Sequence, residues 1–359
     1  MNALALALCL SAQPAPAALN GMDPVELAAG REVRGSDSLA ATDGRYHYWF
    51  ATEANRSTFA ADPLRFGIQM GGACGRMGPL TGRGNMHRYF VHEGKIFIFA
   101  SEQCRDSFKK DPSAHVERTD AVPKGSAEAK RRGLAMLDRA AIAHGGQAVD
   151  EFQSLLWTTQ ETYNVEGKPE IYVSGYAMQW PDRFATQSRW QTSLITSNAS
   201  GAGGWEGDKA SARPIHPDEH AFLRRVFYHH PLIVLRLRKQ PGFVAVPGSG
   251  MLGGEALPTV AAHYGGATTT LYLHPATFKI LGVAYTARRS SYVPIVRQYT
   301  DYATVRGVLT PMAWTDTVES SGAKVPAKLA KVELNLRLDA AGFGDPRKAA
   351  DLLGTPVGS

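Results

Sequence analysis

The sequence has 359 residues, a formal net charge of +6 at neutral pH and three cysteines. A chain of this length is long enough for more than one domain. The positive charge is modest, and no cluster of lysine and arginine stands among aromatic residues, so the sequence does not favour a nucleic-acid-binding protein. Weak peripheral contact with anionic lipid headgroups stays open.

The first seventeen residues read MNALALALCLSAQPAPA, an apolar run that ends in Ala15-Pro16-Ala17. Small residues at these positions are typical of a signal-peptidase cleavage site, so we interpret residues 1–17 as a signal peptide and expect a periplasmic or secreted protein. The segment lacks a positively charged start. Lipidation at Cys9 is an alternative, and no later segment is apolar for the length of a transmembrane helix.

One phrase occurs twice, as FATEANRSTFAADP and as FASEQCRDSFKKDP, with seven residues repeated at one constant spacing. This indicates an internal duplication. In each copy a turn leads into a β-rich run (residues 46–50 and 96–99), and Thr52 or Ser101 then stands where a helix N-cap is expected. Asp-Pro ends the phrase. We therefore expect two copies of a β-hairpin followed by a short helix.

The repeats resemble the YHS domain, a relative of the metal-handling TRASH modules. The residues that carry the resemblance are Gly21-Met22-Asp23-Pro24-Val25, Tyr48-Trp49-Phe50-Ala51, Asn55-Arg56, Phe59, Asp62-Pro63 and Gly71-Gly72-Ala73-Cys74. It implies one YHS-like repeat at 21–73 and a second at 74–116. Metal-binding members carry two cysteines after the strand, where the first copy has Ala51 and Asn55 and the second has Ala100 and Cys104. The resemblance thus implies that the first copy is a metal-free framework and that the second copy holds a site.

Two interpretations of the cysteines stay open. Cys74, Met77 and Cys104, with His92 nearby, would offer the sulfur ligands that copper prefers. In an exported protein, Cys74 and Cys104 would instead form one structural disulfide, which would stabilise the fold by roughly 3 to 4 kcal/mol in the chain-entropy account. Two cysteines of the family pattern are missing, and the compartment favours oxidation.

Residues 117–126 have the composition of a linker. Beyond it, residues 127–144 show helical spacing of apolar side chains and end at Gly145-Gly146, and a short helix is expected at 148–156. Strands are then expected at 170–173, 184–190, 270–273, 280–286, 299–306 and 332–338. Consecutive strands with tight turns predict an antiparallel meander.

This second part resembles the periplasmic lipoprotein carriers of the LolA and LolB type over residues 127–345, with residues 346–359 as a tail. The matching phrases are Ile142-Ala143-His144-Gly145-Gly146, Trp180-Pro181-Asp182-Arg183-Phe184, Gly204-Trp205, Leu271-Tyr272-Leu273-His274-Pro275-Ala276-Thr277 and Asn335. The resemblance implies a curved, incomplete antiparallel barrel with a helical lid, which encloses a cavity for acyl chains and performs no covalent chemistry. The alternative is that helices fill the concave face and nothing binds.

Two short motifs that suggest a specific function are not interpreted as functional sites. Residues 248–253 fit the G-x-G-x-x-G pattern of dinucleotide-binding proteins, but β-branched residues and a proline follow where a helix is required, so we interpret them as a flexible loop. His216 and His220 flank Pro217-Asp218-Glu219, which is typical of a helix start, and we expect a surface pair of histidines.

The sequence therefore predicts an α+β protein in which a duplicated YHS-like module precedes a LolA/LolB-like open barrel. We expect a non-enzymatic binding protein for an apolar ligand, such as a lipid or a lipoprotein acyl chain, in which the YHS-like module binds copper or carries a disulfide. The alternative from another class is a thiol- or copper-dependent periplasmic oxidoreductase that uses Cys74 and Cys104. A structural adaptor that docks partner proteins is a third interpretation.

Overall fold

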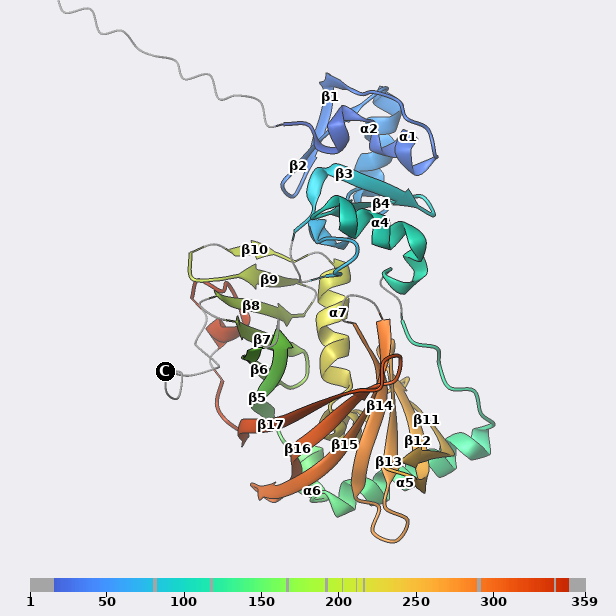
Figure 1. Cartoon of the computed structure of the whole chain (residues 1–359), viewed down its shortest axis with the longest axis vertical. Helices are drawn as coiled ribbons and strands as arrows, with labels where there is room; N and C mark the ends of the chain where they lie inside the picture. Colours follow the sequence, from blue (N-terminus) through green and yellow to red (C-terminus); the bar gives the residue numbers. More distant parts are fainter. Residues whose placement is uncertain are drawn as a thin grey trace, which may run out of the picture. The chain divides into compact units, whose positions relative to one another are not determined.

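The computed structural model describes residues 16–79, 83–116, 119–165, 168–190, 193–201, 203–210, 212–215, 217–288, 292–338 and 340–348. The chain forms two compact units (Figure 1), the first from residues 1–77 and 81–113 and the second from residues 78–80 and 114–359. Residues 1–15 of the expected signal peptide, including Cys9, and most of the expected tail lie outside the described residues. None of the described helices is long and apolar enough to cross a membrane.

The first copy of the repeat folds into a hairpin followed by a helix. Its elements are η1 (Ala18–Gly21), α1 (Pro24–Ala28), β1 (Ser36–Asp43), β2 (Tyr46–Phe50), α2 (Glu53–Ala61) and α3 (Pro63–Phe66). The Thr52 side chain accepts a hydrogen bond from the Asn55 backbone N–H at 3.1 Å and so caps α2. Asp62 ends α2 and caps α3, which begins at Pro63.

The second copy repeats this order. Its elements are η2 (Met70–Gly72), β3 (Asn85–His92), β4 (Lys95–Phe99), α4 (Glu102–Lys110) and η3 (Pro112–Ala114). Ser101 caps α4 by accepting a hydrogen bond from the Cys104 backbone N–H at 3.2 Å. In each copy one helix phenylalanine is buried on the hairpin: Phe59 packs on Tyr48 and Phe50, and Phe108 packs on Phe97 and Phe99.

The second unit is built on one open, antiparallel sheet of thirteen strands, which confirms the predicted antiparallel meander. The strands are β5 (Ser154–Val165), β6 (Lys168–Gln179), β7 (Arg183–Trp190), β8 (Ser193–Ser200), β9 (Gly203–Gly207), β10 (Ala212–Pro214), β11 (Val244–Leu252), β12 (Glu255–Tyr264), β13 (Ala267–Leu273), β14 (Ile280–Arg288), β15 (Tyr292–Val305), β16 (Val308–Val318) and β17 (Ala323–Leu334). Their spatial order is β10-β9-β8-β7-β6-β5-β17-β16-β15-β14-β13-β12-β11. The first and last strands in sequence, β5 and β17, therefore pair in the middle of the sheet.

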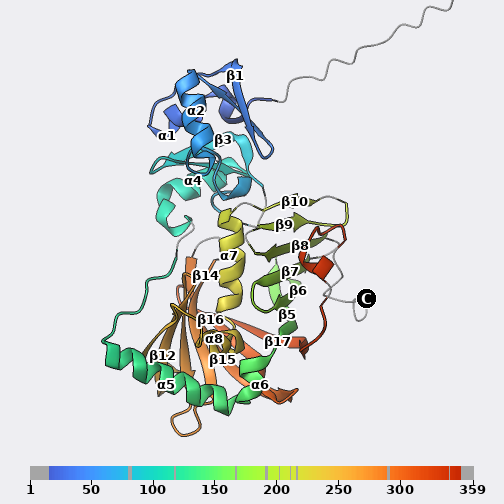
Figure 2. The same cartoon turned by 180° about the vertical axis from the view of Figure 1, so that it is seen from behind.

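Helices accompany this sheet at two places. The amphipathic helix α5 (Ala127–Ala143) packs along β11, and α6 (Gln147–Glu151) follows it. The insertion between β10 and β11 forms α7 (Pro217–Tyr228) and α8 (Pro231–Leu237), and η4 (Ala340–Phe343) comes after the last strand. Figures 1 and 2 both show α7 between the β5–β10 part and the β11–β17 part of the sheet.

The insertion helices fill much of the concave side of the sheet instead of covering an empty barrel. Leu223 and Phe227 of α7 and Leu232–Leu235 and Leu237 of α8 belong to one buried cluster with Val260, Leu271 and Val283 of the sheet. The expected open barrel with a helical lid is thus an open sheet that wraps around its own inserted helices. A ligand could therefore bind on this side of the sheet only in the space that these helices leave unfilled.

Three local expectations differ from the structure. The helix expected at 148–156 ends at Glu151, and β5 begins at Ser154 because Leu155 and Trp157 are buried in the sheet core. Residues 248–252, expected in a flexible loop, continue β11 in register with β12 up to the turn at 253–254. Asp120, in the expected linker, contacts the second unit: its backbone N–H donates to the Gly266 carbonyl at 2.8 Å.

Candidate functional site

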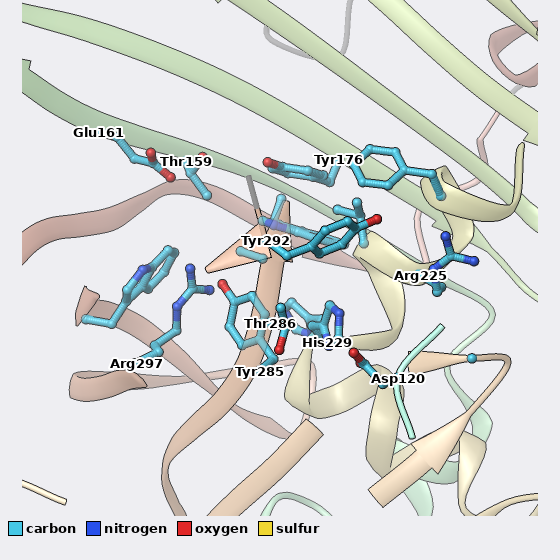
Figure 3. Close-up of a pocket in the computed structure, with 17 residues that line it drawn as sticks. Asp120, Thr159, Glu161, Tyr176, Arg225, His229, Tyr285, Thr286, Tyr292 and Arg297 are labelled. Atoms are coloured by element: carbon cyan, nitrogen blue, oxygen red, sulfur yellow. The ribbon is translucent and has the colours of Figure 1, made fainter. Parts of the chain in front are cut away.

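The second unit contains a cavity of about 200 Å³ between the concave face of the sheet and the α7–α8 insertion (Figure 3). Aromatic side chains form much of its wall. The lining residues are Asp120, Trp157, Thr159, Glu161, Tyr176, Phe222, Arg225, Val226, His229, His230, Gly266, Tyr285, Thr286, Ala287, Tyr292, Arg297 and Trp314.

Strand alternation explains how sequence-distant residues reach this cavity. Trp157, Thr159 and Glu161 are spaced by two along β5, so they share one face of the strand. Tyr285 and Ala287 do the same on β14. The pairing of β5 with β17, and of β17 with β16, brings this row beside Trp314. The cavity is therefore a product of the sheet register.

Arg297 is the most strongly oriented polar group of the cavity. Its Nε and one Nη donate to the two carboxylate oxygens of Asp316 at 2.7 and 2.8 Å. Its guanidinium carbon lies 4.4 Å from the ring centre of Trp314 and 5.8 Å from that of Tyr285. Burial acts to lower the pKa of Arg297, but Tyr285 and the Asp316 carboxylate raise it well above its usual value. Arg297 is a fixed positive charge.

Two consecutive histidines line the cavity and are neutral at physiological pH. Burial lowers the pKa of His229 to about 3, and the charges of Arg225 and Arg297 add to the shift. Burial and Arg297 also lower the pKa of His230 to about 3. His229 Nδ1 is 2.8 Å from the Thr269 hydroxyl. Such rings offer fixed donors and acceptors instead of a titrating group.

Several buried polar atoms of the lining have no hydrogen-bond partner within the described residues. They are Thr159 Oγ1, His230 Nδ1 and Trp314 Nε1. A buried polar group without a partner costs roughly 1–3 kcal/mol. Water or a molecule with hydrogen-bonding groups in the cavity could satisfy these three atoms, whereas a purely apolar molecule would leave them unsatisfied.

The predicted site residues Cys74 and Cys104 lie together in the first unit. Both are buried free thiols, with side chains 0% and 9% exposed. The backbone of Cys74 forms an isolated β-bridge with Ile98, near the end of β4. Cys104 lies in the first turn of α4. The two side chains are hydrogen-bonded to each other.

The surroundings of Cys104 favour its thiolate form. Burial acts to raise its pKa, but hydrogen bonds from Ser101, Cys74 and the Arg76 guanidinium lower it below the ordinary value for a thiol. Arg76 also donates from Nε to the Ser107 hydroxyl at 3.2 Å, which fixes the cation beside the sulfur. A nearby cation and a helix N-terminus are features of a reactive cysteine, whereas burial is typical of an inert one.

The other two predicted ligands do not complete a metal cluster. Met77 donates its backbone N–H to the Cys74 carbonyl at 2.9 Å, while the His92 ring lies 6.2 Å from Phe108. Within the described ranges, no three Cys, His, Asp or Glu side chains gather as a metal site would require. The Arg76 cation beside Cys104 also opposes a second cation there. Copper binding by Cys74, Met77, Cys104 and His92 stays a prediction.

None of the residues that line the cavity in the second unit was predicted from the sequence as a binding residue. The signal available was the alternation of Trp157, Thr159 and Glu161, but residues 148–156 just before them were expected to be helical. The expectation for the histidine pair was wrong in part: His220 of α7 is 8% exposed and therefore buried, while His216 lies outside the described residues.

Comparisons with known proteins give only distant likenesses. No family model matches the sequence, and no curated protein matches it in sequence. Among solved structures, a DUF1329 family protein from Desulfovibrio piger is 11% identical and has a TM-score of 0.40; the match covers 60% of this chain and 97% of that chain. A LolA superfamily protein from Nitrosomonas europaea is 9% identical, with a TM-score of 0.40 and coverage of 59% and 96%. The lipoprotein LppX from Mycobacterium tuberculosis is 10% identical, with a TM-score of 0.26 and coverage of 58% and 98%.

Proposed function

We propose that the second unit is a binding domain for a lipid or a lipidated ligand, with the apolar chain in the cavity between the sheet and the α7–α8 insertion. The observation that carries this proposal is the aromatic wall, formed by Trp157, Tyr176, Phe222, Tyr285, Tyr292 and Trp314. Ligand sites in proteins are concave and mostly apolar, with a few placed polar groups.

The size of the cavity limits the occupant. Pockets for drug-sized ligands measure roughly 300–1,000 Å³, and this one is smaller, at about 200 Å³. A single acyl chain is therefore the proposed occupant, unless α7 and α8 move apart.

The proposed activity is binding and release, without catalysis. A general acid or base works best with a pKa near the operating pH. His229 and His230, both at about 3, and Arg297, well above its usual range, keep one charge state through that region. The lining thus supplies fixed polar contacts.

The test is recovery of a ligand from the purified full chain. We expect organic extraction, followed by mass spectrometry, to release a lipid in stoichiometric amount. Ala287→Trp would fill the cavity that Ala287 lines and should abolish retention. Ala256→Trp, at an exposed position of β12, is the matched control and should retain the lipid. Equal recovery from both variants would place the ligand elsewhere.

A second, thiol-based function is proposed for the first unit, because Cys74 and Cys104 are hydrogen-bonded beside Arg76. Cys104 thiolate would attack a partner protein's disulfide and release one partner thiolate. Cys74 would then displace the second partner sulfur, lose its proton and leave a Cys74–Cys104 disulfide with a reduced partner. Thiol counting on protein purified anaerobically distinguishes this from a static disulfide, and native mass spectrometry of the same sample tests for copper.

We also propose a periplasmic or secreted location, which rests on the expected signal peptide. Determination of the mature N-terminus after expression with residues 1–17 present tests it. A mature chain that still begins at Met1 and stays in the cytoplasmic fraction would contradict this location.

A further inference from the structure

We propose that the cavity of the second unit selects a chain that ends in a carboxylate, which binds the free edge of the Arg297 guanidinium. This inference rests on the proposed binding of an acyl chain. It adds the chemical class of the head group, which the aromatic wall alone does not specify.

The first step is the geometry of the guanidinium. An arginine has five N–H donors in a planar fork. Asp316 takes the Nε–H and one N–H of Nη2, at 2.7 and 2.8 Å. Nη1, together with the remaining N–H of Nη2, forms a second edge with two parallel donors. That edge matches the two oxygens of a carboxylate.

The second step is orientation. Stacking against Trp314 at 4.4 Å, together with the bonds to Asp316, fixes the plane of the Arg297 guanidinium. A ligand carboxylate therefore meets a preorganised donor pair and little side-chain entropy is lost on binding. Figure 3 shows Arg297 in the cavity together with Tyr285 and His229.

The third step is the set of unsatisfied polar atoms. Trp314 Nε1–H is a donor only, and it is buried without a partner among the described residues. His230 Nδ1 is buried without a partner too. An oxygen-rich head group would accept from the Trp314 N–H, whereas an alkyl chain alone would leave it unsatisfied.

The fourth step is charge. The cavity is lined by two arginines, Arg225 and Arg297, and by two acids, Asp120 and Glu161. Asp120 accepts a hydrogen bond from the Thr268 backbone N–H at 2.8 Å. The carboxylate that is hydrogen-bonded to Arg297 is Asp316, and Glu161 contributes to the raised pKa of Tyr176. Asp316 already accepts two hydrogen bonds from Arg297. The other edge of the guanidinium therefore presents two N–H donors in apolar surroundings, where a charge-assisted hydrogen bond is strong.

The experiment compares three probes of one chain length on delipidated full-chain protein: dodecanoate, dodecanol and dodecyl phosphate, each below its micelle concentration, by titration calorimetry. We expect dodecanoate to bind at least about tenfold more tightly than dodecanol, since one charge-assisted hydrogen bond contributes that much or more. Arg297→Lys keeps the positive charge beside Asp316 but removes the planar fork, and should abolish most of this preference. Arg337→Lys, at an exposed position, is the control and should leave it unchanged.

Trp314→Phe keeps an aromatic six-membered ring and removes the N–H, so it should weaken the binding of dodecanoate more than that of dodecanol. This variant tests the proposal if Arg297→Lys does not fold. Trp205→Phe, on β9 outside the cavity, is its control. Equal binding of dodecanoate and dodecanol would overturn the carboxylate inference and leave the proposed lipid binding intact. Tighter binding of dodecyl phosphate would also overturn it, in favour of a tetrahedral head group. Binding of none of the three probes would contradict the proposed function itself.

Discussion

Asn55 Nδ2 donates a hydrogen bond to Asp23 Oδ2 at 2.8 Å in the first copy of the repeat, and in the second copy Cys104 is hydrogen-bonded to Cys74. Asn55 and Cys104 occupy the same position of the repeated phrase, just inside the first turn of their helices. One copy thus joins its helix to the preceding segment by an amide–carboxylate pair, and the other joins it by two thiols.

The amide–carboxylate pair should be important for the stability of the first unit. Asp23 is fully buried and also accepts from the Ala51 backbone N–H at 2.7 Å. Asn55→Ala removes one donor from this carboxylate, and we expect a loss of about 1–3 kcal/mol in the free energy of unfolding. Urea unfolding measures it. Glu53→Ala, at an exposed position of the same helix, is the control, and an equal loss there would contradict a special role for the pair.

The thiol pair should respond to removal of its neighbouring cation. Arg76→Gln removes a hydrogen bond and a positive charge that lower the pKa of Cys104. We therefore expect the pKa of Cys104 to rise, measured as thiolate absorbance against pH with the Cys104→Ser protein as the blank. Arg105→Gln removes the same charge from the residue next to Cys104 and should have a smaller effect. A larger shift for Arg105→Gln would contradict the assignment.

His144 should make the second unit sensitive to acid. Its Nδ1 contacts the Leu309 carbonyl at 2.6 Å, and its Nε2 accepts from the Ile280 backbone N–H at 3.0 Å. Burial lowers its pKa to about 4, whereas the unfolded chain has roughly 6.5. Between these values the unfolded state binds a proton that the folded state does not.

The stability due to neutral His144 is consequently complete above about pH 6.5 and lost as the pH falls toward 4, by about 3 kcal/mol in total. His229 and His230, both with a pKa of about 3, act in the same direction. Urea unfolding at about pH 7 and about pH 4.5 measures the loss. His144→Gln should lose less over the same interval, and an unchanged pH dependence in that variant would show that other groups cause it.

Gly133 should be required for the contact between α5 and β11. A methyl group on its Cα would lie 2.5 Å from the Ala245 carbonyl oxygen. Alanine favours an isolated helix over glycine by about 1 kcal/mol, but the clash should outweigh this, so Gly133→Ala should destabilise the unit by about 1–3 kcal/mol. Ala135→Gly, at an exposed position of the helix, measures the difference in helix propensity between alanine and glycine alone. A stabilised Gly133→Ala protein would contradict the close packing.

The sequence predicted those features that depend on neighbours along the chain. The N-caps Thr52 and Ser101, the helix at 127–144 and the strand from Ile280 are all set by patterns within a few residues. The antiparallel arrangement could also be predicted, because successive strands joined by a short turn pair antiparallel. The YHS-like and LolA-like assignments rest on short phrases and stay interpretations.

The cavity could not be predicted in the same way. Trp157 and Trp314 share its wall because β5 pairs with β17 and β17 with β16, a register that no local pattern determines. The bond between Arg297 and Asp316 likewise joins facing positions of β15 and β16. These contacts depend on strand pairing over long sequence distances, whereas local sequence patterns indicate strands without indicating their partners.

The pairing of β5 with β17 also has a kinetic consequence. Strands β5–β10 form one meander and β11–β17 form another, and within each of them every strand pairs with its neighbour in sequence. Only the β5–β17 ladder, with Leu155 opposite Leu334, joins the two. Local pairings form quickly, whereas a pairing across most of a domain must first close a long loop. We therefore expect each meander to form early and the β5–β17 ladder, which completes the cavity, to form last.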